Sequence, residues 1–367
     1  MSEKKCRWGF LSAAWIGIKN WQSVALSGNG EIVAVASRDQ AKANAWIDEC
    51  SAQVPFPSRP DAVEGYDALL ARDDIDAVYI PLPTGVRKEW VIKAAKAGKH
   101  VLSEKPCGID VSDLEEILAA CSEAGVQFMD GVMFMHSGRL NDLRKSIDDG
   151  TSLGKLRRIH SQFSFCGPED FQQGNIRMHS DLEPLGCVGD LGWYNIRFNL
   201  WVMNYEMPKT VTGVMLNGAS RPDSPNKVPT EFSGEMFYEN GVTASFYCSF
   251  ITAMQQWANL CGTEGNIHLD DFVVPCFGSE VAFTVAKMTS NQHVCDFNME
   301  RREQRVITQE YGNSHPTAQE TSLFRNFGDL VLGGKVDPQW SDITLKTQKV
   351  MMACLESARN GSQPVAL

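Results

Sequence analysis

The chain has 367 residues, more than one ordinary hydrophobic core holds, so two domains are expected. A hydrophobic fraction of 43% and a charged fraction of 22% are typical of a soluble globular protein, and the net charge of -11 argues against a nucleic-acid partner, which needs a basic surface. No apolar run approaches the roughly 20 residues that cross a membrane, and the apolar strand near the N-terminus is too short for a signal peptide, so we expect a cytoplasmic protein.

The cysteine pattern favours neither disulfides nor a metal centre. The 11 cysteines are an odd number, and no two of them form a C-x-x-C pair. His293 and Cys295 are close, but no second ligand pair has the spacing of a zinc finger. We expect reduced, mostly buried thiols and no bound metal.

A β-α-β unit is predicted at the N-terminus. Arg7–Leu11 has the pattern of a strand, a helical pattern follows to about Leu26, and Glu31–Ser37 has the pattern of a second strand. Between the first strand and the helix lies a turn of small residues, Ser12-Ala13-Ala14-Trp15-Ile16-Gly17.

This turn stands where the dinucleotide fingerprint G-x-G-x-x-G is found, but Ser12 and Ala14 replace two of its glycines. Two interpretations remain open. The first N–H groups of the helix could bind a pyrophosphate, or the segment could be an ordinary strand-to-helix turn.

The end of the second strand bears on the choice of cofactor. An Asp or Glu there would bind the ribose 2′-hydroxyl of NAD. The chain instead has Ser37 and Arg38, with Lys42 one turn later, and this combination favours the 2′-phosphate of NADP. Two alternatives stay open: Arg38 stacks on the adenine, or Asp39 contacts the ribose.

Strands and helices alternate through the rest of the first third, with short loops between them, which predicts a doubly wound parallel sheet. The expected helices are Tyr66–Leu70, Glu89–Ala97 and Asp113–Ala124, and the expected strands are Ala77–Ile80, a strand ending at Leu102, and Val126–Met129.

Glu104, Lys105 and Pro106 come just after the strand that ends at Leu102. Ligands of open α/β sheets bind at the carboxyl ends of the strands. The two charges are therefore either part of a site or a surface ion pair.

A series of short motifs runs through the chain in a fixed order. It begins with Gly98-Lys99-His100-Val101-Leu102 and Glu104-Lys105-Pro106, preceded by a strand that ends in a proline-rich loop, and it continues with Phe163-Ser164-Phe165, Glu169-Asp170-Phe171, Asn175-Ile176-Arg177 and Gly189-Asp190-Leu191-Gly192-Trp193-Tyr194. This series resembles the Gfo/Idh/MocA oxidoreductases, which include glucose-fructose oxidoreductase and inositol dehydrogenase. The resemblance covers essentially the whole chain and is greatest to a branch of plant and bacterial members whose substrates are mostly unassigned.

The resemblance implies an N-terminal Rossmann domain, residues 1–128, that binds NAD(P). It implies a C-terminal domain, residues 129–367, with an open, mostly antiparallel sheet, helices on one face, a small-molecule substrate site and contacts for a homodimer or homotetramer. Glu104 and Lys105 are expected near the nicotinamide, and the Lys105–Pro106 peptide bond is expected to be cis. The cofactor-binding residues expected from the turn, the strand end and the resemblance are Ser12, Ala13, Ala14, Trp15, Ile16, Ser37, Arg38, Lys42, Pro81, Leu82, Pro83, Thr84, Arg87, Glu104 and Lys105.

The chain departs from the family pattern at several positions. Besides the two missing glycines, Thr84 replaces a frequent Asn, Arg87 a frequent His and Met135 a common Arg. These departures bear on cofactor affinity and substrate identity more than on the fold.

The second half of the chain is rich in predicted strands with glycine-rich turns, such as Glu239-Asn240-Gly241. No helix long enough for a crossover separates them, so a mainly antiparallel sheet is expected, and an exposed face rich in Phe, Val and Trp would favour self-association. The expected strands are Lys155–Phe165, Thr210–Leu216, Glu231–Tyr238, Val242–Phe250, Gln256–Cys261, Asn266–Leu269 and Val281–Ala286, followed by helices at Ser322–Leu332 and Ile343–Arg359.

Asp190 and Tyr194 lie four residues apart in a helical pattern and share one face, from which both could meet Lys105. The structural alternative is a helix-capping Asp190 and a core Tyr194, and the resemblance favours the catalytic site. His136 is a candidate substrate contact at the domain junction. Arg177 either binds substrate hydroxyl groups or pairs with Asp181 or Asp190.

The predicted reaction is hydride transfer between the nicotinamide and a carbinol or carbonyl carbon of a sugar, polyol or cyclic diol. Tyr194 would exchange the hydroxyl proton, and Lys105 would bind the same oxygen and lower the pKa of the phenol. Asp190 would orient the pair and bind a neighbouring hydroxyl group of the substrate. The main alternative, motivated by the altered glycine turn, is a non-catalytic regulator that senses a dinucleotide. A Rossmann methyltransferase is a third possibility, but it gives no account of the C-terminal strands.

Overall fold

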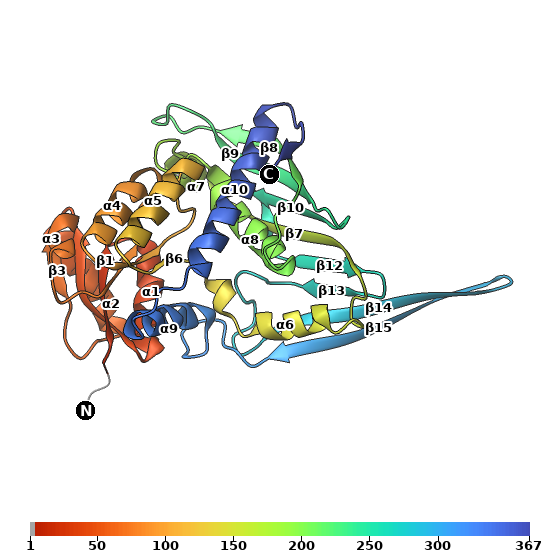
Figure 1. Cartoon of the computed structure of the whole chain (residues 1–367), viewed down its shortest axis with the longest axis horizontal. Coiled ribbons are helices and arrows are strands. Elements are labelled where there is room, and N and C mark those ends of the chain that lie inside the picture. Colours follow the sequence, from red (N-terminus) through yellow and green to blue (C-terminus); the bar gives the residue numbers. More distant parts are fainter. Residues whose placement is uncertain (1–3) are drawn as a thin grey trace.

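The first sheet has six parallel strands in the order β3-β2-β1-β4-β5-β6, as seen in the computed structural model, which describes residues 4–367 (Figure 1). The first three residues of the N-terminal run lie outside the described residues. The strand order reverses between β1 and β4, and a crevice forms at the carboxyl ends of such a pair. The elements are β1 (Cys6–Leu11), α1 (Trp15–Ser27), β2 (Gly30–Ser37), α2 (Gln40–Gln53), β3 (Asp61–Glu64), α3 (Tyr66–Leu70), β4 (Ala77–Ile80), α4 (Thr84–Lys96), β5 (His100–Ser103), α5 (Val111–Glu123) and β6 (Phe128–Asp130).

A helix from the C-terminal part of the chain packs against the first sheet. In α9 (Gln319–Leu332), the rings of Phe324 and Phe327 each pack 5.1 Å from that of Trp8 on β1. The Rossmann unit therefore includes a segment that lies beyond the expected boundary at residue 128, and β6 itself runs across that boundary. The division of the chain at residue 128 stays a prediction, because α9 returns to the first sheet.

The second sheet has ten strands and is mixed but mostly antiparallel, as expected. Its main path is β15-β14-β13-β12-β7-β10-β9-β8-β16, β11 pairs with β7, and only the neighbours β7 and β10 run parallel. The strands are β7 (Leu156–Cys166), β8 (Thr210–Ala219), β9 (Val228–Phe237), β10 (Thr243–Ser249), β11 (Ile251–Gln255), β12 (Ala258–Gly262), β13 (Asn266–Leu269), β14 (Val281–His293), β15 (Asp296–Thr308) and β16 (Val365–Ala366).

Helices cover one face of this sheet and link it to the first. Arg197 on α8 and Asp130 on β6 form a fully buried ion pair, with 2.7 Å between Nη2 and Oδ2, and Arg197 Nε donates to Thr347 on α10. Removing one partner of such a pair is costly, because the other charge stays buried. The remaining helical segments are η1 (Met133–His136), α6 (Arg139–Asp148), α7 (Glu169–Gly174), η2 (Ile176–Met178), η3 (Val188–Gly192), α8 (Trp193–Val202) and α10 (Gln339–Arg359).

The other face of the second sheet is polar, which corrects the expectation of an apolar face. Arg158 on β7 bonds to Glu235 on β9 and to Thr243 on β10, and His160 bonds to Ser245. The alternation along the strands sends most of the large apolar residues to the helix-covered face, although Val214 on β8 is 41% exposed on the polar one. A hydrophobic driving force for self-association therefore does not follow from this surface.

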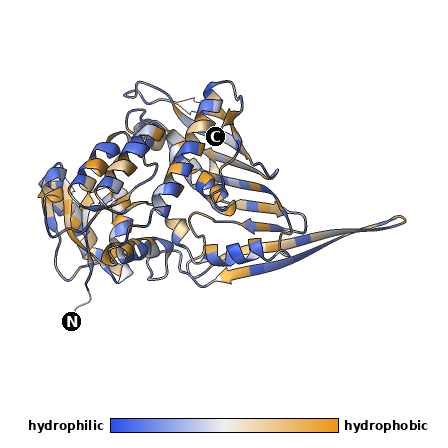
Figure 2. Ribbon diagram, viewed as in Figure 1, coloured by the Kyte–Doolittle hydropathy of each residue, from blue (hydrophilic) through white to orange (hydrophobic). Residues whose placement is uncertain are grey.

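β14 and β15 extend beyond the sheet as a long two-stranded ribbon (Figure 1). Its outer part, residues 287–305, is exposed on both strands, and hydrophobic and hydrophilic residues follow one another along it (Figure 2). The predicted strand Val281–Ala286 covers only the inner half of β14.

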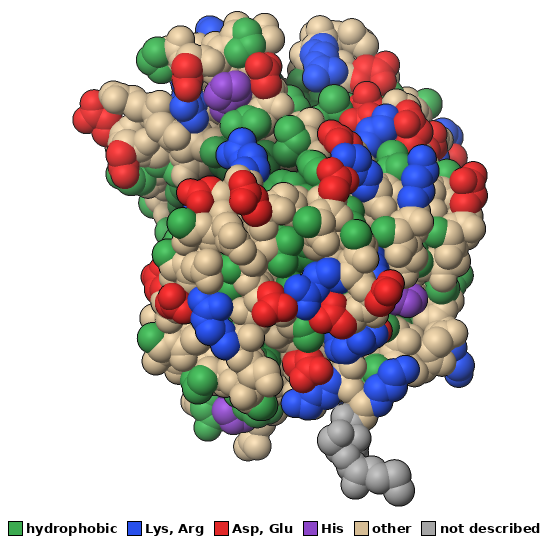
Figure 3. All heavy atoms as spheres, turned by 90° about the vertical axis from the view of Figure 1, so that its left-hand side faces the viewer, with side chains coloured by type: hydrophobic (Ala, Val, Ile, Leu, Met, Phe, Trp, Pro, Cys, Tyr) green, Lys and Arg blue, Asp and Glu red, His purple; other side chains and the backbone are tan. Residues whose placement is uncertain are grey.

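Acidic and basic side chains are interspersed on the face of the molecule that carries the first domain (Figure 3). Within residues 4–367, no helix is both long enough and apolar enough to cross a membrane.

Candidate active site

Lys105 lies two residues after the end of β5, and its side chain contacts the second domain. Its Nζ donates to Asp190 Oδ1 at 2.7 Å and to the Asp190 carbonyl oxygen at 2.6 Å. The Lys105–Pro106 peptide bond is cis, as the resemblance implies. Lys105 therefore forms an interdomain ion pair with Asp190 and not a surface ion pair with Glu104.

Asp190 is held by two cations. It lies in η3, a single wide helical turn that leads directly into α8, and its second oxygen accepts from Arg177 Nε at 2.8 Å. Burial opposes ionisation of Asp190, but Arg177 and Lys105 outweigh it, so its pKa lies below the ordinary value. Of the partners considered for Arg177, the structure selects Asp190.

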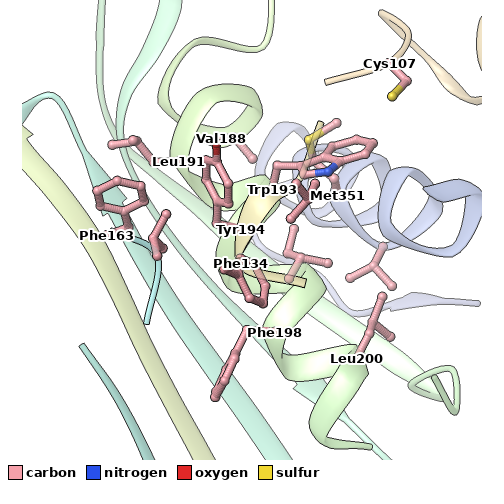
Figure 4. Packing of buried hydrophobic residues seen from close by; sticks show 14 of the residues in the cluster. Cys107, Phe134, Phe163, Val188, Leu191, Trp193, Tyr194, Phe198, Leu200 and Met351 are labelled. Carbon is pink, nitrogen blue, oxygen red and sulfur yellow. The ribbon is translucent and has the colours of Figure 1, made fainter. Parts of the chain in front are cut away.

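Tyr194 follows on the first turn of α8 and points toward the sheet, whereas its neighbour Trp193 points toward Met351 of α10 (Figure 4). The ammonium of Lys105 lies over its ring, 4.6 Å from the centroid, and the nearest partner of its hydroxyl is Met133 Sδ at 3.6 Å. Lys105, Asp190 and Tyr194 therefore come together as predicted.

The expected lowering of the phenol's pKa is not found. Burial, followed by the charges of Glu104 and Asp190, raises the pKa of Tyr194 well above its ordinary value. The ammonium that was expected to lower it is already paired with Asp190. Tyr194 is thus a neutral phenol that holds its proton.

Glu104 is positioned by two residues that no motif in the sequence indicates. Tyr79 on β4 donates to Glu104 Oε1 at 2.6 Å, and Asn20 on α1 donates to the Tyr79 oxygen at 2.7 Å. Because an amide nitrogen only donates, the series of hydrogen bonds runs from Asn20 through the Tyr79 hydroxyl to Glu104 Oε1, which accepts.

These side chains meet in an interdomain cleft of about 510 Å³. Its walls include the predicted residues Trp15, Ile16, Pro81, Leu82, Pro83, Arg87, Glu104, Lys105, Arg177, Asp190 and Tyr194. The cleft is also lined by Lys19, Asn20, Glu183 and Glu320, which the sequence analysis did not single out. Glu320 borders the cleft because α9, the helix on which it lies, packs against the first domain.

The turn before α1 fits the phosphates of a dinucleotide. Ala14, the N-cap of α1, makes no side-chain hydrogen bond, so the first N–H groups of this 13-residue helix are left for an anion. Ser12, at the position of the first fingerprint glycine, has a φ of 139°, a value that favours glycine. Ser12, Ala13 and Ala14 are partly exposed and adjoin the cleft lining at Trp15.

One buried carboxylate oxygen in the wall of the cleft, Oε2 of Glu320, receives no hydrogen bond from the described residues. Glu320 is 4% exposed and pairs through Oε1 with Lys19, while Oε2 has no hydrogen-bond partner within residues 4–367. An orphaned carboxylate oxygen in a cleft wall fits a ligand that donates from an amide or a hydroxyl group.

Ser37, Arg38 and Lys42 lie outside this cleft, at and after the end of β2. Ser37 is buried, whereas Arg38 and Lys42 are exposed. Asp39 caps α2 by accepting from the backbone of Ala41 at 2.8 Å, which leaves it a structural role.

The start of α4 contacts the second domain at the cleft. Thr84 is buried and donates to both oxygens of Glu183, from its backbone N–H at 3.0 Å and from Oγ1 at 2.6 Å. Arg87 is buried and donates to the carbonyl oxygens of Leu82 and Pro106. Arg87 borders the cleft, but Thr84 does not, because its hydroxyl is turned to Glu183.

His136 does not lie in the cleft lining. It is 8% exposed, its ring stacks on Trp340 at 4.8 Å, and its Nδ1 lies 3.0 Å from Asn326 Nδ2. Burial, and secondarily Arg197, lower its pKa to about 3. The structure therefore gives His136 a place in the packing of the domain junction and leaves it out of the substrate site proposed below.

Fold and site together define a two-domain protein of the dinucleotide-fold class, with a lysine, an aspartate and a tyrosine gathered at its interdomain cleft. Family comparison agrees, since the model described as "Oxidoreductase family, NAD-binding Rossmann fold" matches residues 6–132 and that of the "GFO/IDH/MocA C-terminal domain" matches residues 140–268. The chain belongs to the Gfo/Idh/MocA oxidoreductase family.

Two relatives and one solved structure illustrate the similarity. D-xylose 1-dehydrogenase (NADP(+)) 2 of Haloferax volcanii is 29% identical over 96% of this chain and 98% of its own. A dTDP-3,4-didehydro-2,6-dideoxy-alpha-D-glucose 3-reductase of Streptomyces violaceoruber is 31% identical over 69% of each chain. The crystal structure of a 3-ketoreductase from Actinomadura kijaniata with NADP and TDP-benzene has a TM-score of 0.78 at 24% identity, over 98% of both chains, and shares the fold. The two named relatives are a dehydrogenase and a reductase, which gives no support to a non-catalytic regulator.

Proposed function

We propose that this protein is an NADP(H)-dependent oxidoreductase that acts on a carbinol or carbonyl carbon of a sugar, polyol or cyclic diol. The observation that carries the proposal is the meeting of Lys105 with Asp190 and Tyr194 across the domain boundary, in a cleft that reaches the uncapped start of α1. The named relatives act in the same chemical class by name.

The cofactor would be held along one side of the cleft. The start of α1 would take its phosphates, residues 81–83 and Arg87 would border the nicotinamide, and Glu104 would accept a hydrogen bond. Arg38, with Ser37 and Lys42, would bind the 2′-phosphate that distinguishes NADP from NAD. When bound, the nicotinamide supplies or accepts the hydride.

The side chains of the second domain act on the oxygen of the substrate. Tyr194 holds its proton, which would be donated when a carbonyl is reduced. Lys105 has one N–H left beyond the two that bond to Asp190, and this N–H would bind the same oxygen. Arg177, whose side chain is 39% exposed, would bind a neighbouring substrate oxygen.

The proposal also includes the location of the enzyme in the cell and its oligomeric state. We expect the enzyme to be cytoplasmic and to form homodimers or homotetramers through the polar face of the second sheet. Light scattering coupled to gel filtration measures the oligomeric state.

A substrate panel tests the proposed activity. NADPH binding is first measured by the fluorescence of the nicotinamide, and aldoses, polyols and vicinal diols are then assayed with NADP+ and NAD+, and the matching carbonyl compounds with NADPH and NADH. We expect turnover in at least one class and a preference for the phosphorylated cofactor. Tight NADPH binding without turnover in either direction would overturn the proposal.

A further inference from the structure

Large apolar side chains surround the mouth of the cleft. Trp15 on α1 is 81% exposed, Met254 on β11 is 66% exposed, and Ile176 on η2 and Val274 after β13 are 44% and 40% exposed. They come from both domains and all of them line the same cleft. Apolar groups gathered in this way at a cleft mark a binding surface, whereas scattered ones do not.

The apolar surface continues inward along β7. Phe163 and Phe165 are two residues apart in this strand and therefore face the same side, and both line the cleft. The Phe163 ring lies 5.7 Å from that of Tyr194. One wall is thus apolar from the phenol to the mouth.

The acidic side chains of the same wall are already engaged. Both oxygens of Glu183 accept from Thr84, and the two oxygens of Asp190 accept from Lys105 and Arg177. On this wall the free hydrogen-bonding groups are mainly donors: the guanidinium of Arg177, the hydroxyl of Tyr194 and the third N–H of Lys105. The orphaned acceptor, Oε2 of Glu320, lies on α9, which packs against the first domain. A free sugar has a hydroxyl on nearly every carbon, and each one buried against this wall would lose a bond to water without replacing it.

We infer that the substrate carries an aromatic or branched alkyl group beside its reacting carbinol or carbonyl carbon, and that this group binds between Phe163, Phe165 and Met254. The inference rests on the proposed function and narrows its substrate class from sugars in general to diols or hydroxy ketones with an apolar substituent. Lys105, Tyr194 and Arg177 recognise the oxygens, and the apolar wall recognises the substituent.

Binding to the NADPH complex tests this without requiring turnover. Dissociation constants are measured by calorimetry for 1-phenylethane-1,2-diol and for propane-1,2-diol, which share the diol and differ in the substituent. We expect the phenyl compound to bind at least about tenfold more tightly, as a matched apolar pocket allows. Equal affinities, or no binding of the phenyl compound, would overturn the inference.

A pair of exposed methionines supplies the variant and its control. Met254→Gln conserves length at a residue of the mouth, and we expect it to weaken phenyl diol binding about threefold to tenfold without changing NADPH affinity. Met299→Gln changes a 57% exposed methionine on the β15 ribbon, and we expect no effect. An effect of Met254→Gln on oligomeric state, with unchanged phenyl diol affinity, would assign the apolar mouth to a second copy of the chain and contradict the inference.

Turnover measurements distinguish a failure of the proposed function from a failure of the inferred apolar substrate class. A phenyl diol that binds selectively but is not oxidised with NADP+, alongside an inactive panel, would refute the proposed function and leave the apolar subsite established. Turnover of free aldoses at least as efficient as that of the phenyl diol would refute the apolar substrate class alone.

Discussion

The ammonium of Lys105 lies over the face of the Tyr194 ring, 4.6 Å from its centroid, and not beside the phenol oxygen. The two groups therefore do not form a directly bonded pair, although both border the same cleft. A cation over an aromatic face is attracted to the ring and not to its hydroxyl group. The contributions of the phenol proton and of the ammonium are thus separable by mutation.

Tyr194→Phe removes only the hydroxyl group, because the ring that supports Lys105 is retained. We expect the rate of carbonyl reduction to fall by about 10²- to 10⁴-fold, the usual contribution of a positioned acid. NADPH affinity should stay within about threefold, as measured by nicotinamide fluorescence. A variant that reduces its substrate at the rate of the unmodified enzyme would remove Tyr194 from the proton-transfer step.

The pH profile gives a second measure of the same group. Since the pKa of Tyr194 is raised, its proton is retained as pH rises, so reduction by the unmodified enzyme should not lose this donor below about pH 9. A fall in the rate of reduction with a midpoint near neutral pH, absent from Tyr194→Phe, would show that the phenol ionises far more easily than its burial indicates.

Much of the fold was predictable because local pattern and tertiary structure agree. Tyr66–Leu70 and Ala77–Ile80 have the expected bounds, and the first two strands begin within one residue of the expected positions. β15 was missed, because its outer part is polar and charged and it is fixed by pairing with β14 along its whole length. The start of α4 at Thr84 was placed five residues too late, because the prolines before it were taken to extend the loop.

The site residues that belong to sequence motifs were predictable, whereas those brought to the site only by the tertiary fold were not. Lys105, Asp190 and Tyr194 belong to ordered motifs and converge. Tyr79 reads only as an apolar strand residue, and its bond to Glu104 depends on two neighbouring strands ending side by side. Glu320 could not be found in advance, since amphipathic spacing does not say which sheet a helix covers.

Arg38 is expected to set the choice between the two nicotinamide cofactors. Arg38→Ala removes the guanidinium at the end of β2. The loss of a charge-assisted hydrogen bond of about 1.5 to 3 kcal/mol predicts an affinity for NADPH that is 10- to 100-fold weaker. The affinity for NADH should change by less than about threefold. Equal losses for both cofactors would mean that Arg38 contacts a part they share, such as the adenine.

His136 is expected to make the folded state sensitive to acid. Its pKa is about 3 in the fold against 6.5 for the free side chain, so between these values the unfolded chain binds the proton and stability falls as pH falls. This one residue contributes up to about 1.4 kcal/mol per pH unit to the slope. Urea unfolding of His136→Gln between about pH 6 and pH 4 should show a correspondingly flatter slope than the unmodified chain. Parallel slopes would contradict a buried neutral imidazole.

We expect Lys105, beyond its contact with Asp190, to act on the oxygen of the substrate and not to determine cofactor affinity, and the single-turnover rate of Lys105→Met tests this role. Asp190 keeps Arg177 as a partner in this variant, and Lys145→Met, at a lysine whose side chain is 76% exposed on α6, is the matched control. With the best substrate of the panel, we predict a rate lowered by about 10²- to 10⁴-fold, with NADPH affinity and the control unchanged. A single-turnover rate equal to that of the unmodified enzyme would show that Lys105 has no part in the reaction.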